Sequence, residues 1–209
     1  MTFKNRQEAA DQLVQRLQAY QDKNPLVLAI PRGAIHMAKR LAEGLQGDLD
    51  VVLVHKLGAP GQPELAIGAV DETGEVYLHP YAKLIGVGQS YLEQEIQNQV
   101  SLLRVRRKNY TPLRQSINPQ GRIVIVVDDG IATGATMIAA LNALRKKNPK
   151  KIIVATAVAP ASTVEKLENF ADEVVCLEAP EDFRAVGQFF EDFSQVSDEE
   201  VIQALRSRK

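Results

Sequence analysis

Short apolar runs rich in β-branched residues alternate along this chain with segments of helical spacing. Polar residues almost never interrupt the runs, which are Leu26–Ile30, Val51–Val54, Ile123–Val127, Ile152–Val158 and Val174–Leu177. A strand that is apolar on both faces is typical of a parallel sheet covered by helices on each side. The segments between the runs place apolar residues three and four positions apart, as an amphipathic helix does. We therefore predict an α/β fold with a Rossmann-like central parallel sheet flanked by helices.

The charge balance and the single cysteine narrow the classes of function. The chain has 25 Lys and Arg against 26 Asp and Glu, a formal net charge of −1, which argues against a generally basic nucleic-acid binder. The basic cluster Arg104–Lys108 admits a local nucleic-acid patch, but cations at a helix C-terminus are the simpler interpretation. Cys176 lies in an apolar run, so we expect a small core residue without a disulfide.

The beginning of the chain gives no sign of export. It lacks the apolar core of a signal peptide, and no apolar run approaches the ~20 residues that a membrane helix needs. We therefore expect a cytoplasmic protein with no membrane partner.

Two stretches break the alternation of strands and helices. Residues 56–80 contain several Gly and Pro residues followed by two candidate strands, Leu65–Val70 and Glu75–Leu78, which predicts a mobile loop leading into a β-hairpin. A long helical pattern then ends near Tyr110. We find no repeat and no linker, so the whole chain is expected to form one domain.

The C-terminal stretch is rich in phenylalanine. Four of the six Phe residues fall within eleven positions there: Phe183, Phe189, Phe190 and Phe193. A small hydrophobic cluster is one interpretation, and an aromatic lid that stacks on a flat ligand is the other. Ser197–Glu200 has the pattern of a capped helix start.

The segment Arg122–Thr136 carries the strongest functional signal. A buried strand leads directly into Asp128 and Asp129, then into a loop of small residues and a new helix. Small residues allow a ligand to approach the backbone, and the N–H groups at a helix start favour an anion such as phosphate. Two carboxylates beside an anion site make sense if the ligand also brings hydroxyl groups or Mg²⁺.

This segment resembles the phosphoribosylpyrophosphate (PRPP) signature of type I phosphoribosyltransferases. The shared pattern is an apolar strand, two acidic residues and a Thr-Gly loop, and it differs from a Walker A loop because no Gly-Lys-Ser/Thr follows. Ala135 stands where the family usually has a second glycine. The loop Pro31–Ala34 after the first strand resembles the family's pyrophosphate loop, and Lys56 follows the second strand, where the family often places a cation.

The resemblance implies an organisation for the chain. A single phosphoribosyltransferase domain, residues 1–209, would have its core at about 26–177. A flexible loop would cover about 57–71, and a helical insertion about 80–110. A small hood would hold the acceptor, built mainly from residues 178–209 with part of the N-terminal segment.

The resemblance also implies a function. Such an enzyme transfers the 5-phosphoribosyl group from PRPP to a nitrogenous base or amine, with Mg²⁺ as cofactor and pyrophosphate as product. Catalytic roles would fall to Asp128, Asp129, Arg32 and Lys56, with the aspartates contacting ribose hydroxyls or the magnesium shell through PRPP and water. The residues expected to bind PRPP are Arg32, Gly33, Lys56, Asp128, Asp129, Gly130, Ile131, Ala132, Thr133, Gly134, Ala135 and Thr136. Phe183, Phe189 and Phe190 are the weaker candidates for acceptor contact.

Several alternatives stay open at this point. Neighbouring residues of a strand point to opposite faces, so the two aspartates reach one ligand only if the strand ends or twists there. Ala132 stands where 6-oxopurine enzymes carry a further Asp, so the acceptor is not identified. A regulatory homologue that senses PRPP or a nucleotide without turnover is the main alternative function. Family members are often homodimers, but the sequence leaves the oligomeric state open.

Overall fold

Five parallel strands form the centre of the molecule. The computed structural model describes residues 2–78, 82, 86–112 and 115–206. The strand order is β2-β1-β6-β7-β8, and every neighbouring pair is parallel. The strands are β1 (Leu26–Ala29), β2 (Asp48–Val51), β6 (Ile123–Gly130), β7 (Lys151–Val158) and β8 (Glu173–Glu178). The predicted α/β fold with a parallel sheet is therefore confirmed.

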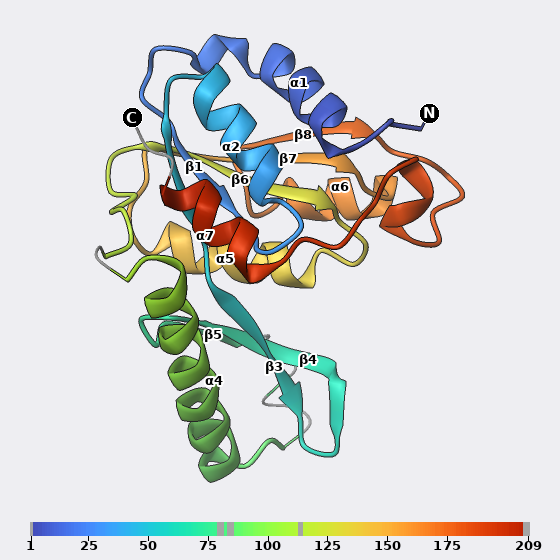
Figure 1. Ribbon diagram of the computed structural model, residues 1–209. Helices are drawn as coiled ribbons and strands as arrows, with labels where there is room; N and C mark the ends of the chain where they lie inside the picture. Colours follow the sequence, from blue (N-terminus) through green and yellow to red (C-terminus); the bar gives the residue numbers. More distant parts are fainter. Residues whose placement is uncertain (1, 79–81, 83–85, 113–114, 207–209) are drawn as a thin grey trace.

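Helices cover both faces of this sheet (Figure 1). One face carries α1 (Arg6–Arg16) and α2 (Ile35–Gly44), and the other carries α5 (Ala135–Arg145) and α6 (Ala161–Leu167). Alternate residues of β6 enter the two resulting cores: Ile125 and Val127 pack on the α1–α2 side, whereas Val124 and Val126 pack on the α5–α6 side. This double coverage explains why the strands have no polar face.

The order of the strands creates a switch point between β1 and β6. The chain moves from β1 outward to β2 through α2, and from β6 outward in the opposite direction to β7 through α5. Because such crossovers are right-handed, the two helices lie on opposite faces of the sheet.

The apolar run Val51–Val54 is not one strand. β2 ends at Val51, and Val54 begins β3 (Val54–Ala59), which belongs to a second sheet. Asp48 and Asp50 lie inside β2, and these two polar residues break the apolar pattern by which the other strands were predicted. Asp50 is fully buried because it accepts from Arg107 and from the N–H groups of Val51 and Ile117.

A separate arm projects from the body (Figure 1). It consists of β3, β4 (Gln62–Asp71), β5 (Val76–Leu78) and the long helix α4 (Gln89–Tyr110). The expected mobile loop at 57–71 is instead a paired hairpin, in which β3 and β4 run antiparallel and turn at Pro60 and Gly61. Part of the expected insertion at 80–110 lies outside the described residues.

Arg107 fixes the base of the arm. Its guanidinium donates to Asp50 Oδ1 at 2.8 Å, to both carboxylate oxygens of Glu72 at 2.6 and 2.7 Å, and to Val51 O at 2.8 Å. The basic cluster Arg104–Lys108 lies at the C-terminal end of α4, as expected, and one of its members, Arg107, is a largely buried structural residue.

The N-terminal segment pairs with the C-terminal stretch near Phe190. Phe3 N donates to Phe189 O at 2.8 Å, and Phe3 forms an isolated parallel bridge with Phe190. The C-terminal stretch continues through the short helix η2 (Val186–Phe189) to α7 (Asp198–Arg206). Ser197 and Glu200 cap α7 reciprocally, as the sequence predicted. A short helix η1 (Gln18–Tyr20) follows α1.

Candidate functional site

Two loops leave the sheet side by side at the switch point. β1 and β6 are hydrogen-bonded neighbours with Ala29 opposite Val127, and Ile30 N donates to Val127 O at 3.0 Å. The loop Pro31–Ala34 and the loop that follows Asp129 therefore emerge together at the carboxyl edge. Open α/β sheets bind their ligands at this position.

The loop before α5 leads into a helix start of the kind that favours an anion. Gly134 occupies the N-cap of α5 with a φ of +75°, a conformation that favours glycine. Thr163 Oγ1 donates to Ala132 O at 2.7 Å and holds the loop in place. Gly134 has no side chain to cap the first turn of α5, and the nearest side-chain acceptor is the Oγ1 of the exposed Thr133, which lies 3.5 Å from Ala135 N. Uncapped N–H groups at a helix start attract phosphate.

Gly130 and Ile131 support this loop from below. A Cβ on Gly130 would lie 2.3 Å from Val186 Cγ1, so only glycine allows the C-terminal stretch to cover this strand end. Ile131 N donates to Val158 O at 2.9 Å, and its side chain is buried. The expectation that Ile131 offers an N–H to the ligand is therefore wrong, because β7 already accepts it.

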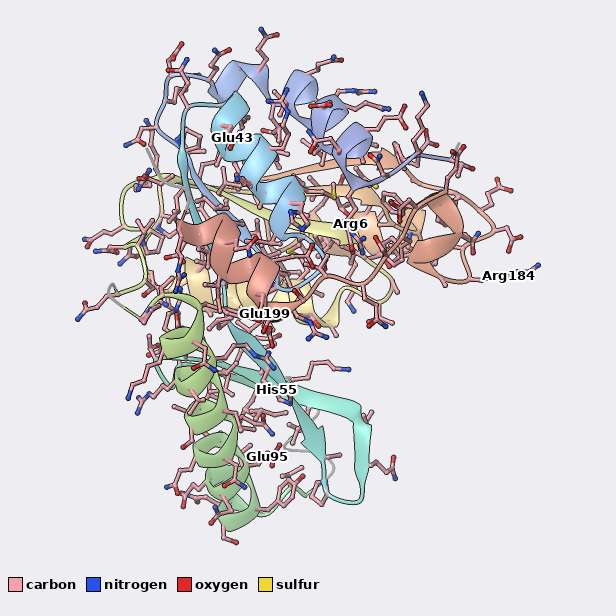
Figure 2. All side chains as sticks on the ribbon, in the orientation of Figure 1. Arg6, Glu43, His55, Glu95, Arg184 and Glu199 are labelled. Carbon is pink, nitrogen blue, oxygen red and sulfur yellow. The ribbon has the colours of Figure 1, made fainter. Side chains whose placement is uncertain are left out.

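The two adjacent aspartates have different surroundings. Asp129 is 8% exposed and faces α1, where Arg6 Nε donates to its Oδ2 at 2.8 Å. Arg6, labelled in Figure 2, also donates to Ser194 O at 2.8 Å and lies 4.0 Å above the Phe193 ring. Asp129 is thus paired within the protein, and Arg6 connects it to the C-terminal stretch.

Gly33 brings the first loop against Asp129. A Cβ at this position would lie 2.4 Å from Asp129 Oδ2, so the carboxylate occupies the space that any other residue would fill. The peptide bond between Pro31 and Arg32 is cis. The structure therefore joins the two loops directly, through a glycine of one and an aspartate of the other.

Asp128 forms no ion pair with any residue that the structure describes. It is half-buried, and its Oδ1 accepts from Asp129 N at 3.0 Å. Burial raises the pKa of Asp128 well above its usual value, and the charge of Asp129 raises it further, while the Asp129 N–H and Arg6 oppose the shift. The sequence left open whether both aspartates point at one ligand, and the structure places them on opposite faces of β6.

The two predicted cations lie on different parts of the molecule. Arg32 is half exposed at the first loop, with its Nη1 3.8 Å from Asp198 Oδ2. Lys56 lies on β3 of the arm, opposite Ala69. Its neighbour His55, labelled in Figure 2, has its pKa lowered mainly by burial, with nearby cations adding to the effect.

The aromatic residues form a cluster among themselves. Phe189 and Phe190 are 7% and 6% exposed, and Phe190 stacks on Phe193 at 5.1 Å between ring centres. Phe183 is half-buried and stacks on Phe189 at 5.6 Å. This burial argues against free ring faces at Phe189 and Phe190 and leaves Phe183 as the aromatic candidate for ligand contact.

Sequence reasoning missed the partners that position these groups. Arg6 lies 123 positions from Asp129, and nothing near it in the sequence marks its role. Asn5 and Glu8 do mark the start of α1, because Asn5 Oδ1 caps the N–H of Glu8. Tyr110 and Asp198 were also missed, although their hydrogen bond joins α4 to α7 beside Arg32.

Among the described residues, no group of three or more His, Cys, Asp or Glu side chains could hold a metal ion. Asp128 can contribute one carboxylate to Mg²⁺, which fits a cation whose other ligands are substrate phosphates and water. None of the helices in the described ranges combines the length and the apolar character needed to cross a bilayer.

Comparisons with known proteins agree with this geometry. A family model described as phosphoribosyl transferase domain matches residues 3–194. The crystal structure of TT1426 from Thermus thermophilus covers 98% of both chains at 46% identity, with a TM-score of 0.89. Rv0571c of Mycobacterium tuberculosis, whose name assigns it provisionally as a phosphoribosyl transferase, is 40% identical over 204 residues.

The curated relatives are longer than this chain. The match to Rv0571c covers 97% of this chain but 46% of that protein, so the chain spans about half the length of the relative. A ribose-phosphate pyrophosphokinase of Pyrococcus furiosus is 34% identical over 95 residues, which is 44% of this chain and 31% of that enzyme.

Proposed function

Because the chain belongs to the phosphoribosyl transferase domain family, we propose that it transfers the 5-phosphoribosyl group of PRPP to a nitrogen of a base or amine. The C1–O bond to pyrophosphate breaks, and pyrophosphate leaves with the electron pair. A C1–N bond forms to the acceptor, which gives up a proton. The observation that carries this proposal is the meeting of an anion-binding loop, a carboxylate and an arginine loop at one switch point.

The start of α5 holds the 5′-phosphate in this proposal. The donors are the backbone N–H groups of residues 132–136 and the hydroxyls of Thr133 and Thr136. Ile131 supports them from β7 and does not itself donate to the ligand.

Asp128 contacts the ribose hydroxyls and faces the positive charge that develops at C1. A partly buried carboxylate with few protein partners is stabilised more by hydroxyl donors and by a nearby positive charge than a fully solvated carboxylate is. Asp129, held by Arg6, positions the first loop through Gly33. Arg32 and Lys56 then stabilise the charge of the departing pyrophosphate.

Mg²⁺, held by Asp128 together with substrate oxygens and water, would neutralise charge on the pyrophosphate group. The β3–β4 hairpin is the segment that we expect to cover the reacting atoms and exclude water, so that PRPP is not hydrolysed.

The acceptor is a base or amine that needs no aspartate at position 132. Ala132 lies at the exposed surface of the loop, where 6-oxopurine enzymes carry the carboxylate. Of the three phenylalanines expected to contact the acceptor, Phe183 is the one that is half-buried rather than buried. A homologue that binds PRPP without turnover is the second candidate, and the experiment below separates the two.

A homodimer is the assembly we propose. Leu102 and Val105 are 63% and 57% exposed on α4, three positions apart on one face. The N-terminal half of α4 carries Glu93 and Glu95, and its C-terminal half carries the exposed cations Arg104, Arg106 and Lys108, so an antiparallel pairing with a second copy brings opposite charges together. Light scattering should then give a dimer mass that falls to the monomer mass in Leu102→Glu. A monomer at high concentration of the unmodified protein would refute the pairing.

The test of function begins with binding of Mg·PRPP. Calorimetric titration of the unmodified protein should give micromolar binding, and Asp128→Asn should weaken it at least about tenfold, consistent with loss of a charge-assisted contact. Asp11→Asn, at a surface ion pair on α1, is the matched control and should bind normally.

A screen for pyrophosphate release over bases and amines follows. Release with one acceptor identifies the reaction. Binding without release from any acceptor favours the sensing homologue, and no PRPP binding at millimolar concentration refutes the proposal.

A further inference from the structure

A charged pocket lies where the body meets the arm. Its volume is about 370 Å³, and it is lined by Pro31, Arg32, Arg106 and Asp198. These residues come from three elements: the first loop, α4 of the arm, and the start of α7, which packs against both α2 and α4 (Figure 1). The pocket therefore combines Arg32 with a second arginine that the sequence assigned only to a helix end.

The Asp198 carboxylate lies in this pocket and is held there by a hydrogen bond. Its Oδ1 accepts from the hydroxyl of Tyr110, a residue that is 2% exposed. Burial raises the pKa of Tyr110, and Asp198 raises it further, so the hydroxyl stays protonated and remains a donor. The second oxygen of Asp198 lies 3.8 Å from Arg32 Nη1, which is too long for a hydrogen bond.

The guanidinium groups of Arg32 and Arg106 can still donate hydrogen bonds to a ligand. Arg32 is 53% exposed, Arg106 is exposed, and both lie close enough to Tyr110 to lower its pKa. Two guanidinium groups facing one carboxylate leave a net positive charge. Guanidinium groups bind phosphate oxygens in pairs, so such a pocket suits a di- or polyphosphate better than a single carboxylate.

We propose that Arg106 acts with Arg32 to bind the pyrophosphate group, and that Asp198 competes with this anion for the two arginines. The inference rests on the proposed function, and it adds a residue of the arm and a residue of α7 to the site. Binding of pyrophosphate then removes Arg32 from Asp198 and connects the arm to the body through Arg106.

The test uses inorganic pyrophosphate as the probe. Calorimetric titration should show that Arg106→Gln weakens pyrophosphate binding about tenfold, whereas Arg104→Gln leaves it unchanged. Arg104 is the matched control, because it is an exposed arginine on the same helix whose side chain donates to Glu72 O. Asp198→Asn keeps an oxygen for Tyr110 but removes the competing charge, so it should bind pyrophosphate several-fold more tightly.

Mg·PRPP titrated into the same proteins separates this inference from the proposed function. Equal pyrophosphate affinity in Arg106→Gln and Arg104→Gln, with normal PRPP binding by the unmodified protein, would overturn the role of Arg106 and leave the function standing. Unchanged affinity in Asp198→Asn, with a thermal midpoint like the parent's, would overturn the competition. Pyrophosphate binding that depends on Arg106, without any PRPP binding, would support the pocket and refute the function.

Discussion

The ion pair between Arg6 and Asp129 gives the sharpest prediction about stability. Its side chains are 12% and 11% exposed, and Arg6 also holds Ser194 O. Removing one partner of a buried pair leaves an uncompensated charge and costs about 3–5 kcal/mol. Because this pair retains a little exposure, we expect Arg6→Met to cost about 3 kcal/mol. At roughly 2–4 °C per kcal/mol for a chain of this size, the melting temperature should fall by about 6–12 °C.

Arg40→Met is the matched control for this prediction. Like Arg6, Arg40 forms an ion pair with an aspartate. Its partner Asp11 lies on α1, and the two side chains are 39% and 44% exposed. Exposed ion pairs contribute about 0–1 kcal/mol to stability, so Arg40→Met should lower the free energy of unfolding by at most about 1 kcal/mol.

Urea unfolding of the single and double variants measures the coupling directly. The cost of Arg6→Met with Asp129→Asn together should be at least about 1 kcal/mol smaller than the sum of the two single costs, because each single change strands the other group. Additive costs, or an Arg6→Met effect no larger than that of Arg40→Met, would refute the reasoning.

Three further predictions concern the same region and the arm. Because the pKa of Asp128 is raised in the folded state, that state holds the proton more tightly than the unfolded chain, and stability falls as pH rises from about 4 towards the raised pKa. Asp128→Asn should therefore unfold at higher urea concentration than the parent at alkaline pH, with the difference vanishing near pH ~4; an equal difference at both pH values would contradict this. Arg107→Met removes the cation that pairs with the buried Asp50 and the half-buried Glu72 and should cost about 3 kcal/mol in urea unfolding, whereas Arg104→Met should stay within about 0.5 kcal/mol. Gly33→Ala puts a methyl group 2.4 Å from Asp129 Oδ2 and should lower both the melting temperature and PRPP affinity; unchanged values for both would show that the loop relaxes freely.

The central sheet could be predicted because its signal is local. The apolar runs around Leu26, Ile123, Ile152 and Val174 each became a strand within a few residues of the expected bounds. The prediction of one strand at Val51–Val54 was wrong, because an apolar run does not show that its two ends pair in different sheets.

The predicted hairpin of Leu65–Val70 with Glu75–Leu78 is confirmed by the pairing of β4 with β5, but the segment before it was predicted least well. Gly and Pro at 58–63 indicated a loop, but only Pro60 and Gly61 form the turn, and Pro63 lies inside β4. A paired hairpin gains its stability from strands and a helix elsewhere in the chain, here from β5 and α4, so a local pattern underestimates its order.

The candidate site divides in the same way. The loop before α5 and the two aspartates follow one strand, so a contiguous motif was enough to predict where they lie. Arg6, Arg106 and Asp198 come from distant segments, and their roles depend on the distances between those segments. For Ile131 the motif predicted the position but not the hydrogen bond, because the Ile131 N–H donates to Val158 O of β7.

The pairing of Phe3 with Phe189 and Phe190 also sets an order in which the site is completed during synthesis. β6 and its carboxylates leave the ribosome well before the segment that carries Phe190 and Ser194. Arg6 can meet Asp129 early, but the carbonyl and the ring that hold its guanidinium arrive only with that later segment. Contacts of such long sequence separation form slowly. A nascent chain that has formed the sheet therefore still lacks the contacts that Phe193 and Ser194 give to Arg6, and these form only when that later segment joins it.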